Sequence, residues 1–434
     1  DEFQFTWKKL KGDFILQARG KFTGEGTEAH RKFGLMIRSS LGTSSAMVCA
    51  ALHGNGLASL QFRKKEAGNV EQDTFVLRAP DVVQLERRGH EFIMSVAHSG
   101  EIYTTGAVSA IDLGDEVYAG LFVCSHNKDV KETAVFDNVR ITVPAPATLV
   151  PYRDYLASRI ESMDVFTGHR LVLTTSTTSL QAPNWTPDDR YLIYNSNGII
   201  YRFDLRSKQT APINTDTIKK NNNDHVLSFD GTQLGLSSGY GKYNSVVFTV
   251  PVGGGNPKLI TPVGPSYLHG WSPDKRFLVY TAERGDGNFD IYRIPSEGGQ
   301  EVRLTTAEGL HDGPEYSPDG KYIYFNSVRG GSMQIWRMNN DGTNQVQITD
   351  DQFNNWFPHI SPDGKWIQFL SFENDVKADQ HPFYKHVYIR MMPVGYGVPH
   401  VIAYLYGGQG TINTPSWSPD SRKIAFVSNT KMDN

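Results

Sequence analysis

A turn of the Ser-Pro-Asp type recurs along the last two thirds of this 434-residue chain and restricts the folds open to it. Successive turn aspartates are separated by 42, 44, 45, 44 and 57 positions. Proline presets φ and the glycine that often follows tolerates a positive φ, so each copy favours a tight turn between strands. The six copies are Thr186-Pro187-Asp188, Ser228-Phe229-Asp230, Ser272-Pro273-Asp274, Ser317-Pro318-Asp319, Ser361-Pro362-Asp363 and Ser418-Pro419-Asp420.

The stretch 311–349 shows what one repeat contains. Its turn is followed by Lys-Tyr-Ile-Tyr-Phe, then by Gln-Ile-Trp-Arg-Met and by Val-Gln-Ile-Thr, with Gly-rich or Asn-Asp-Gly turns between them. A single unit of this kind exposes unpaired strand edges and is not stable alone. A period near forty with about four short strands per unit is typical of a β-propeller blade, so we predict six blades.

The sixth unit stops short, because the sequence ends soon after its first complete strand. Two runs upstream, 162–166 and 169–173, look like the second half of a blade. We therefore expect the two ends of the propeller, residues 161–434, to pair and close the ring. A large apolar or aromatic residue precedes each turn, where it would pack between neighbouring blades: Trp185, Leu227, Trp271, Tyr316, Ile360 and Trp417.

These repeats, with an aromatic residue before Ser-Pro-Asp-Gly and an alternating strand after it, resemble the TolB-type six-bladed propeller family. The resemblance covers about the last two thirds of the chain. The family includes a periplasmic partner of cell-envelope complexes, propellers associated with peptidases and, more distantly, oligogalacturonate lyases. One fold serves all of these functions, so the resemblance implies the architecture more firmly than the activity.

Residues 1–143 carry short alternating strands with no segment of helical period, which predicts a β-sandwich. The order of Gly-Asp-Phe-Ile-Leu, Phe-Gly-Leu-Met-Ile-Arg, Tyr-Ala-Gly-Leu-Phe-Val and Phe-Asp-Asn-Val-Arg-Ile resembles a concanavalin A-like (laminin G-like) jelly roll. Such a domain binds carbohydrate in some proteins and only supports its neighbour in others. A linker over 144–160 follows, with a stiff Pro-Ala-Pro-Ala start and a brief helix over 152–160.

Charge and composition limit the partners and the compartment. The net charge of −3 gives no basic footprint for nucleic acid, and no run of 18 apolar residues predicts a membrane span. The sequence begins without Met and almost inside a strand, which suggests a processed or truncated product of a periplasmic or secreted protein. Cys49 and Cys124 fit either buried free thiols or a disulfide.

Four histidines occupy similar places ahead of the turns. His225 and His269 lie three residues before the turn serine, His359 two, and His311 six, with Glu315 two before the same serine. If all four imidazoles reach one rim, two sites are possible. His225, His269, His311 and His359 would hold one divalent ion such as Mn²⁺ or Ca²⁺, or His311, Glu315 and His359 would transfer protons. The alternative is that each histidine only bonds a neighbouring blade or caps a turn.

Other residues suggest what a ligand could be. Asn355 and Trp356 suit a sugar, with an amide for hydroxyls and an indole for the ring, and Arg329 suits an anionic group. Trp356 could instead pack under a loop and Arg329 could sit in a solvated turn. The inserted loop 372–386 carries Asp375, Asp379, His381 and His386, which fit a calcium site or a mobile charged loop.

Two functions follow. The first is an exported glycan-active protein that binds, and in its enzymatic version cleaves, a saccharide at the propeller rim, as the resemblance to oligogalacturonate lyases also implies. The second is a non-catalytic, TolB-like scaffold of the cell envelope that binds another protein. No part of this sequence remains for a second, catalytic domain with a peptidase triad, so we do not expect a prolyl-oligopeptidase-like enzyme.

Overall fold

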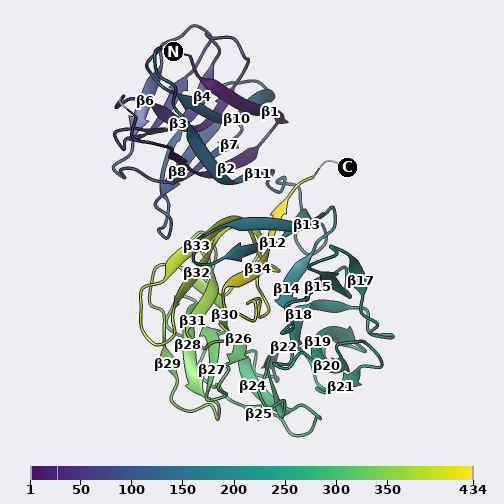
Figure 1. Ribbon diagram of the computed structural model, residues 1–434. Coiled ribbons are helices and arrows are strands. Elements are labelled where there is room, and N and C mark those ends of the chain that lie inside the picture. Colours follow the sequence, from purple (N-terminus) through teal and green to yellow (C-terminus); the bar gives the residue numbers. More distant parts are fainter. Residues whose placement is uncertain (1, 27, 433–434) are drawn as a thin grey trace. The chain divides into compact units, whose positions relative to one another are not determined.

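The computed structural model describes residues 2–26 and 28–432. Over these residues the chain forms strands and turns and contains no helix, so it has no helix that could cross a membrane. It divides into two compact units, Asp1–Pro144 (unit 1) and Ala145–Asn434 (unit 2). The protein is therefore all-β, as the alternating patterns predicted (Figure 1).

Unit 1 contains two antiparallel sheets. The first has the order β1-β10-β3-β4-β5-β6 and the second the order β11-β2-β7-β8-β9. Their bounds are β1 Gln4–Lys11, β2 Phe14–Phe22, β3 Lys32–Arg38, β4 Met47–His53, β5 Ala58–Arg63, β6 Glu71–Thr74, β7 Val82–Arg88, β8 Glu91–Ala97, β9 Thr104–Val108, β10 Glu116–Cys124 and β11 Ala134–Thr142.

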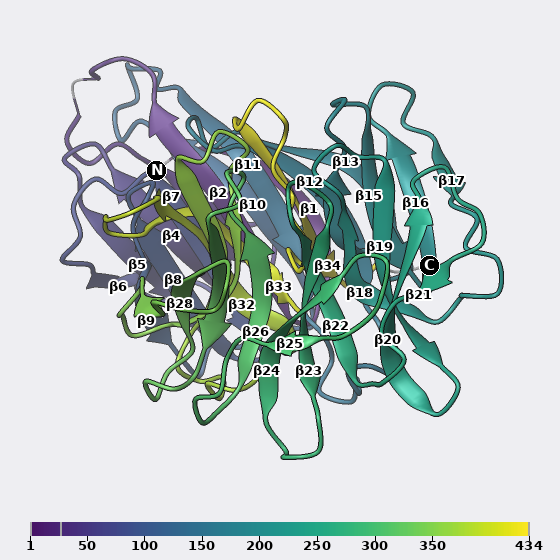
Figure 2. The same cartoon turned by 90° about the horizontal axis from the view of Figure 1, so that it is seen from below.

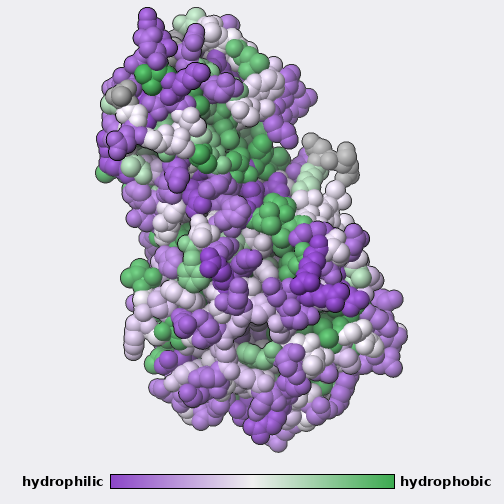
Figure 3. Space-filling model, in the orientation of Figure 1, coloured by the Kyte–Doolittle hydropathy of each residue, from purple (hydrophilic) through white to green (hydrophobic). Residues whose placement is uncertain are grey.

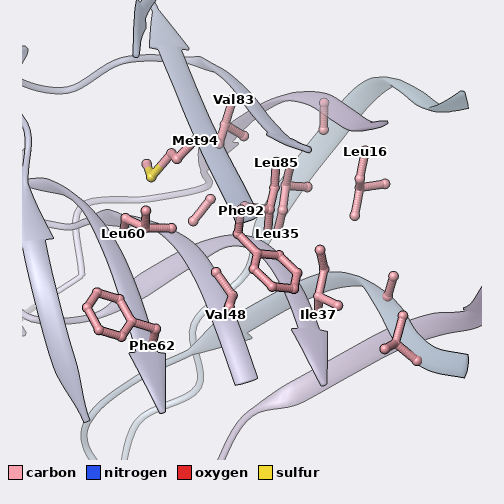
Figure 4. Packing of buried hydrophobic residues seen from close by; sticks show 14 of the residues in the cluster. Leu16, Leu35, Ile37, Val48, Leu60, Phe62, Val83, Leu85, Phe92 and Met94 are labelled. Carbon is pink, nitrogen blue, oxygen red and sulfur yellow. The ribbon is translucent and has the colours of Figure 1, made fainter. Parts of the chain in front are cut away.

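Alternation along these strands explains the core of unit 1. Leu35 and Ile37 of β3 point to the side where Leu85 and Phe92 of the other sheet also lie, and all four are fully buried (Figure 4). A side chain of this size contributes about 1.5–3 kcal/mol when it is removed from water. The sheets thus share one apolar core. Cys49 lies on the other face of the first sheet, and both cysteines are free thiols.

Unit 2 contains six sheets among the described residues. One has three strands, in the order β13-β12-β34, and each of the other five is a four-stranded meander (Figures 1 and 2). The bounds are β12 Ala157–Asp164, β13 Arg170–Ser176, β14 Gln181–Trp185, β15 Tyr191–Ser196, β16 Ile199–Asp204, β17 Thr210–Pro212, β18 Asn221–Leu227, β19 Gln233–Tyr240, β20 Tyr243–Pro251, β21 Lys258–Leu259, β22 Ser266–Trp271, β23 Phe277–Glu283, β24 Phe289–Pro295, β25 Val302–Arg303, β26 His311–Tyr316, β27 Tyr322–Ser327, β28 Gln334–Asn339, β29 Val346–Gln347, β30 Asn354–Ile360, β31 Trp366–Phe372, β32 Phe383–Pro393, β33 His400–Gly408 and β34 Lys423–Thr430.

The recurring turn closes itself with its own side chains. In the fourth copy, the Ser317 hydroxyl donates to Asp319 Oδ1 at 2.7 Å and accepts the backbone N–H of Tyr322 at 3.0 Å. The following Gly320 has φ +71°, a value that glycine adopts without strain. The serine or threonine hydroxyl donates to the turn aspartate in all six copies. The spacing of the turns therefore sets the spacing of the sheets.

The first strands of the four-stranded sheets contact one another in sequence order, from β14 through β18, β22 and β26 to β30. They lie toward the middle of unit 2, whereas β17, β21, β25 and β29 lie at its periphery (Figure 1). Strand β12 pairs with β34 near the end of the chain, and Trp417 adds a bridge to Ile424. Two tryptophans before the turns join neighbouring sheets, since Trp271 Nε1 donates to the Val226 carbonyl at 2.9 Å and Trp417 Nε1 to the His359 carbonyl at 3.1 Å.

Several first strands contain a bulge. The register shifts between Asp312 and Glu315 in β26 and between Trp356 and His359 in β30, and shifts also occur in β14, β18 and β22. Gly313 in the β26 bulge has φ +61°, and a Cβ there would come within 2.6 Å of Asn326 Oδ1. A bulge bends the strand and re-aims the side chains on either side of it. Residues at equal distances from the turn therefore need not share a direction.

The brief helix predicted over 152–160 is wrong. Residues 151–154 form turns, in which Asp154 Oδ2 accepts the Val150 N–H at 3.1 Å, and β12 begins at Ala157. The reason is tertiary, because this segment is recruited as the central strand of a sheet between β13 and β34. Part of the predicted linker thus belongs to the sheet structure of unit 2.

Candidate functional site

A cavity of about 920 Å³ opens in unit 2, among the starting ends of the first strands. Its wall comes from β14, β18, β22 and β26, from the inserted loop before β32, and from the segment after β33. Three kinds of side chain dominate it: amides, aromatic rings and a small group of ionisable residues. The ionisable residues with carboxylate or imidazole groups are Asp224, His269, Asp312, Asp379 and His381.

Asp312 is the centre of the ionisable group. Its Oδ1 lies 3.2 Å from His269 Nε2 and accepts the Thr281 hydroxyl at 2.7 Å and the Gly313 N–H at 2.8 Å. Its Oδ2 lies 3.9 Å from His381 Nε2. Strand β26 thus supplies a carboxylate between an imidazole from β22 and another from the inserted loop.

The electrostatics of this group follow from burial and pairing. Burial raises the pKa of Asp312, but its hydrogen bond to His269 and the charge of that ring outweigh burial and lower the pKa to about 2. For His269, burial lowers the pKa, yet the Asp312 hydrogen bond and the charges of Asp224 and Asp312 raise it above its ordinary value. Burial dominates at His381 and lowers its pKa. Each group of the pair therefore favours the charged form of the other.

Asp224 is the second carboxylate of the cavity, on β18. Burial and the charge of Asp312 raise its pKa to about 6, although His269 and a hydrogen bond from Asn413 act in the opposite direction. Amides continue the network, since Asn413 Nδ2 donates to Gln409 Oε1 at 3.2 Å and Gln409 Nε2 donates to Asn223 Oδ1 at 3.3 Å. Gln409 Oε1 also bonds to the ring of His381. The floor of the cavity is thus a connected polar network.

Of the four histidines considered for a metal site, only His269 lines this cavity. His225 is fully buried beside the Ile193 carbonyl, 3.3 Å from its Nε2, and burial lowers its pKa to about 4. His311 is also fully buried, with Nδ1 at 2.8 Å from Ser327 Oγ and Nε2 at 2.9 Å from the Ala307 carbonyl. The expectation that four imidazoles share one rim is therefore corrected. The bulges turn them in different directions.

Glu315 and His359 meet each other but not the cavity. Glu315 Oε2 lies 2.6 Å from His359 Nδ1, and its Oε1 accepts the Ile360 N–H at 3.0 Å. The other ring nitrogen of His359 donates to the Ile412 carbonyl. Both residues are buried, and all of these bonds cross between neighbouring segments of unit 2. The pair joins sheets, and His311 does not belong to it.

The proposed sugar and anion contacts are engaged within the protein. Asn355 is buried, and its amide nitrogen donates to Gln334 Oε1 at 3.0 Å. Trp356 is fully buried with its ring 4.4 Å from that of His381, so it packs beneath the inserted loop. Arg329 donates to Gln345 Oε1 at 2.7 Å and stacks on the Trp336 ring at 4.5 Å. None of the three lines the cavity.

The described residues contain no group of three or more His, Cys, Asp or Glu side chains placed to hold a metal ion. The residues expected as ligands therefore do not fit a shared divalent ion, because each histidine bonds a different segment. The four residues of the inserted loop that were considered for a calcium site do not all lie together either. Asp375 pairs with Lys385 at 2.9 Å, whereas Asp379 and His381 reach the cavity and His386 packs against the Tyr406 ring.

Sequence reasoning missed Asp224 and Asp312, although each stands next to a histidine that it singled out. A shift of one residue along a strand moves a side chain to the opposite face. The signal was present in Asn-Asn-Asn-Asp-His and in His-Asp-Gly-Pro-Glu, where a carboxylate, amides and a glycine accompany the histidine. The glycine marks the bulge that the count from the turn did not include.

Unit 1 has a groove of its own, about 1320 Å³ in volume, on the outer face of its first sheet. Phe3, Phe5 and Trp7 alternate toward it from the first residues, and Phe122 of β10 lies opposite Phe5. Trp7 remains 41% exposed. Figure 3 shows that apolar side chains also gather on the visible face of this unit.

Comparison with known proteins points to one family. A family model described as the TolB beta propeller domain matches residues 269–381, which begin within β22 and include β23–β31. An uncharacterized protein of Agrobacterium fabrum is 41% identical over 273 residues, which are 63% of this chain and 92% of that protein. The Tol-Pal system protein TolB of Francisella tularensis is 38% identical over 53 residues, 12% of each chain.

A solved structure from Agrobacterium tumefaciens, provisionally assigned as TolB, has 40% sequence identity and a TM-score of 0.62. The match covers 64% of this chain and all of that one. Identity at this level over nearly the whole length of both Agrobacterium proteins shows that they and the matched part of this chain share common descent as well as a common fold. The chain belongs to the family of TolB-like β-propeller proteins.

Proposed function

We propose that this protein is an exported, non-catalytic binding protein of the cell envelope, and that the cavity of unit 2 docks a segment of a partner protein. Its relatives include a TolB of the Tol-Pal system, so the partner we propose is a protein of the Pal type in the periplasm. We further propose that unit 2 is a six-bladed ring closed by β12 and β34 and that unit 1 is a concanavalin A-like jelly roll. The six sheets, the β12–β34 pairing and the shared core of two antiparallel sheets support this.

The lining of the cavity is the observation that carries the proposal. Amides and aromatic rings make up most of it, and these groups suit a peptide, with hydrogen bonds for its backbone and apolar surface for its side chains. The imidazole of His269 and the carboxylate of Asp312 are bonded to each other. Because each group already bonds the other, the pair stabilises the cavity wall. This favours a role in binding a ligand over a role in proton transfer.

Site-specific photo-cross-linking tests the docking site. A benzophenone amino acid at Phe289, on the cavity wall, is compared with the same group at Tyr396, which is 97% exposed on another loop. We expect cell-envelope extract to yield one defined adduct from position 289 and none from position 396. The partner identified by mass spectrometry is then purified, and Phe289→Ala should weaken its binding by about tenfold, the loss expected for a buried aromatic contact.

Two results would overturn the docking proposal. One is an adduct that forms equally from both positions, and the other is a purified partner that binds the Phe289→Ala variant as tightly as the wild-type protein. Thermal melting of each variant serves as the control for folding. Turnover of a polysaccharide by the purified protein, abolished by substitutions in the cavity, would instead support the glycan-active function.

The groove of unit 1 supports a second candidate, which is binding of a saccharide. Alternating aromatic rings along β1 offer the apolar faces on which pyranose rings stack, and Lys32 and Arg63 border the same groove. Trp7→Ala should reduce retention of the protein on an immobilised polysaccharide, whereas Trp336→Ala in unit 2 should not. Equal retention of both variants would remove this candidate.

A further inference from the structure

We propose that the cavity of unit 2 recognises a cationic group, an ammonium or a guanidinium, through Asp224 and the amides of β18. This inference rests on the proposed docking function and specifies the chemistry of the group that docks. The corresponding ligand is a lysine or arginine side chain of the partner protein, or a free amine that carries the same group.

The charges of the cavity wall are the first argument. Asp224, Asp312 and Asp379 contribute three carboxylates, and the described wall contains no lysine or arginine. His269 compensates Asp312 at 3.2 Å, whereas Asp224 and Asp379 form no ion pair within 4 Å among the described residues. Asp379 is exposed at the rim and Asp224 is buried deeper. The wall thus keeps a negative charge that draws a cation inward from the rim.

Unmatched amide atoms are the second, independent observation. Asn221 is 6% exposed, and its Oδ1 has no hydrogen-bond donor, although its Nδ2 donates to the Gly198 carbonyl at 2.8 Å. Asn223 is 4% exposed, and its Nδ2 has no acceptor. Both residues line the cavity. Buried polar atoms are rarely left without partners, so a pair of them on one strand in the cavity wall favours a polar ligand at this place.

The two atoms define complementary groups on that ligand. An ammonium or guanidinium N–H would donate to Asn221 Oδ1, and its charge would lie near the Asp224 carboxylate on the same strand. A carbonyl of the ligand would accept from Asn223 Nδ2. A basic residue within a peptide has both groups, whereas a simple amine has only the first.

Aromatic rings of the wall fit the same ligand. Tyr267 and Phe289 come from β22 and β24, and Tyr155 contributes from the segment before β12. Ring faces attract cations, and they also cover the methylenes of a lysine or arginine side chain. An anionic ligand would meet carboxylates on this wall with no basic side chain to compensate them.

The charge of Asp224 depends on pH near neutrality. Its pKa of about 6 means that the carboxyl becomes protonated as the pH falls below 6, which removes the attraction for a cation. A guanidinium stays charged throughout this range, so its binding should weaken as the pH falls from about 7.5 to about 5. The titratable groups that line the cavity with Asp224 are Tyr152, Tyr155, Tyr267, His269, Asp312, Asp379 and His381.

Calorimetric titration of the full-length protein tests the inference with defined probes. The probes are acetyl-Ala-Lys-Ala-amide, its arginine analogue, its neutral norleucine analogue and butylammonium chloride. We expect the lysine peptide to bind at least about tenfold more tightly than the norleucine peptide. Norleucine ends in a methyl group and lacks the ammonium that would donate a charged hydrogen bond. Asp224→Asn should lose about tenfold in affinity for the lysine peptide. Asp216→Asn, at an exposed aspartate outside the cavity wall, should lose nothing.

The probes also distinguish the sources of the cation. Tighter binding of the lysine peptide than of butylammonium indicates a side chain of a protein, because only the peptide offers a carbonyl to Asn223. Equal binding of the two indicates a free amine. Equal binding of the lysine and norleucine peptides, or unchanged affinity in a folded Asp224→Asn protein, overturns the inference.

If Asp224→Asn does not fold, the pH series decides with the wild-type protein. Weaker binding of the arginine peptide at pH 5 than at pH 7.5 supports the inference, and equal binding overturns it. The outcome of this binding test can be distinguished from the outcome of the cross-linking test for docking. A cross-linked partner without cation preference keeps the docking function alone, and cation preference without a cross-linked partner keeps the cation site alone.

Discussion

Two histidine–carboxylate pairs lie on neighbouring first strands of unit 2, and they differ in their surroundings. Glu315 and His359 are 2.6 Å apart, and each also bonds the backbone of another segment. Asp312 and His269 are 3.2 Å apart and line the cavity. The same residue types thus join sheets in one place and form the wall of a binding site in the other.

The difference shows which property marks a functional pair. Distance between the partners does not, because the shorter pair is the structural one. Position does, since Asp312 and His269 line the cavity and Glu315 and His359 do not, although all four residues are largely buried. A buried pair that loses one partner leaves an uncompensated group in the interior, whereas a cavity pair that loses one partner can be solvated.

Loss of the buried pair should have the largest effect. Glu315→Ala removes the acceptor of both His359 Nδ1 and the Ile360 N–H, so we expect a loss of about 3–5 kcal/mol in the free energy of unfolding. Urea denaturation measures it. Glu315→Gln keeps an acceptor for Ile360 and should lose less. A loss below about 1 kcal/mol in Glu315→Ala would show that the pair does not join the sheets.

Loss of the cavity pair should have a smaller effect. His269→Ala leaves Asp312 with its bonds from Thr281 and Gly313, and water can replace the ring. We expect a loss of about 1.5–3 kcal/mol in the free energy of unfolding in the same denaturation assay, the range for one hydrogen bond to a charged group.

His359→Ala is the matched control for that experiment, and it should cost more than His269→Ala. Equal losses in the two variants would remove the contrast between the pairs. A larger loss in His269→Ala would reverse it and would make the cavity wall the principal contact between these sheets.

The smallest effect is a dependence of stability on pH. The pKa of His269 is raised, so its contribution is fully present below about pH 6.5 and is lost as the pH rises through its folded pKa. The pKa of Asp312 is lowered to about 2, so its contribution is fully present above pH 3.8 and is lost as the pH falls toward 2.

The difference in melting temperature between wild-type protein and His269→Ala should therefore be largest between about pH 4 and pH 6.5. It should shrink on both sides of this window. Melts of both proteins across pH 3 to 9 measure the difference. A constant difference from about pH 4 to 9 would mean that His269 stabilises the protein without its charge.

Much of the architecture could be predicted from the sequence, because the repeated turn carries its own hydrogen bonds. Ser317, Asp319 and their equivalents close each turn locally, so counting them predicts where sheets begin. The polar edge strands β6 and β9 were not predicted. They lack the alternation of buried residues that marks a strand, because most of their side chains are exposed.

The candidate site could be predicted only as a region. His269 and His381 were singled out, but the direction of a side chain depends on bulges that the spacing of the turns does not reveal. In β26 the register shifts between Asp312 and Glu315, so Asp312 faces the cavity while His311 faces Ser327. The repeat sets where each first strand lies, and local backbone geometry sets which of its residues the cavity receives.

The pairing of β12 with β34 has a consequence for how unit 2 forms. Glu161 accepts the Ser428 hydroxyl at 2.6 Å across 267 positions of the chain. Contacts so distant in sequence raise the contact order, and folding slows because a long loop must close before they form. Until the last strand arrives, β12 has an open edge that another copy could occupy. Because β12 and β34 are the first and last strands of unit 2, we expect their pairing to couple the unfolding of the sheets between them into one cooperative event.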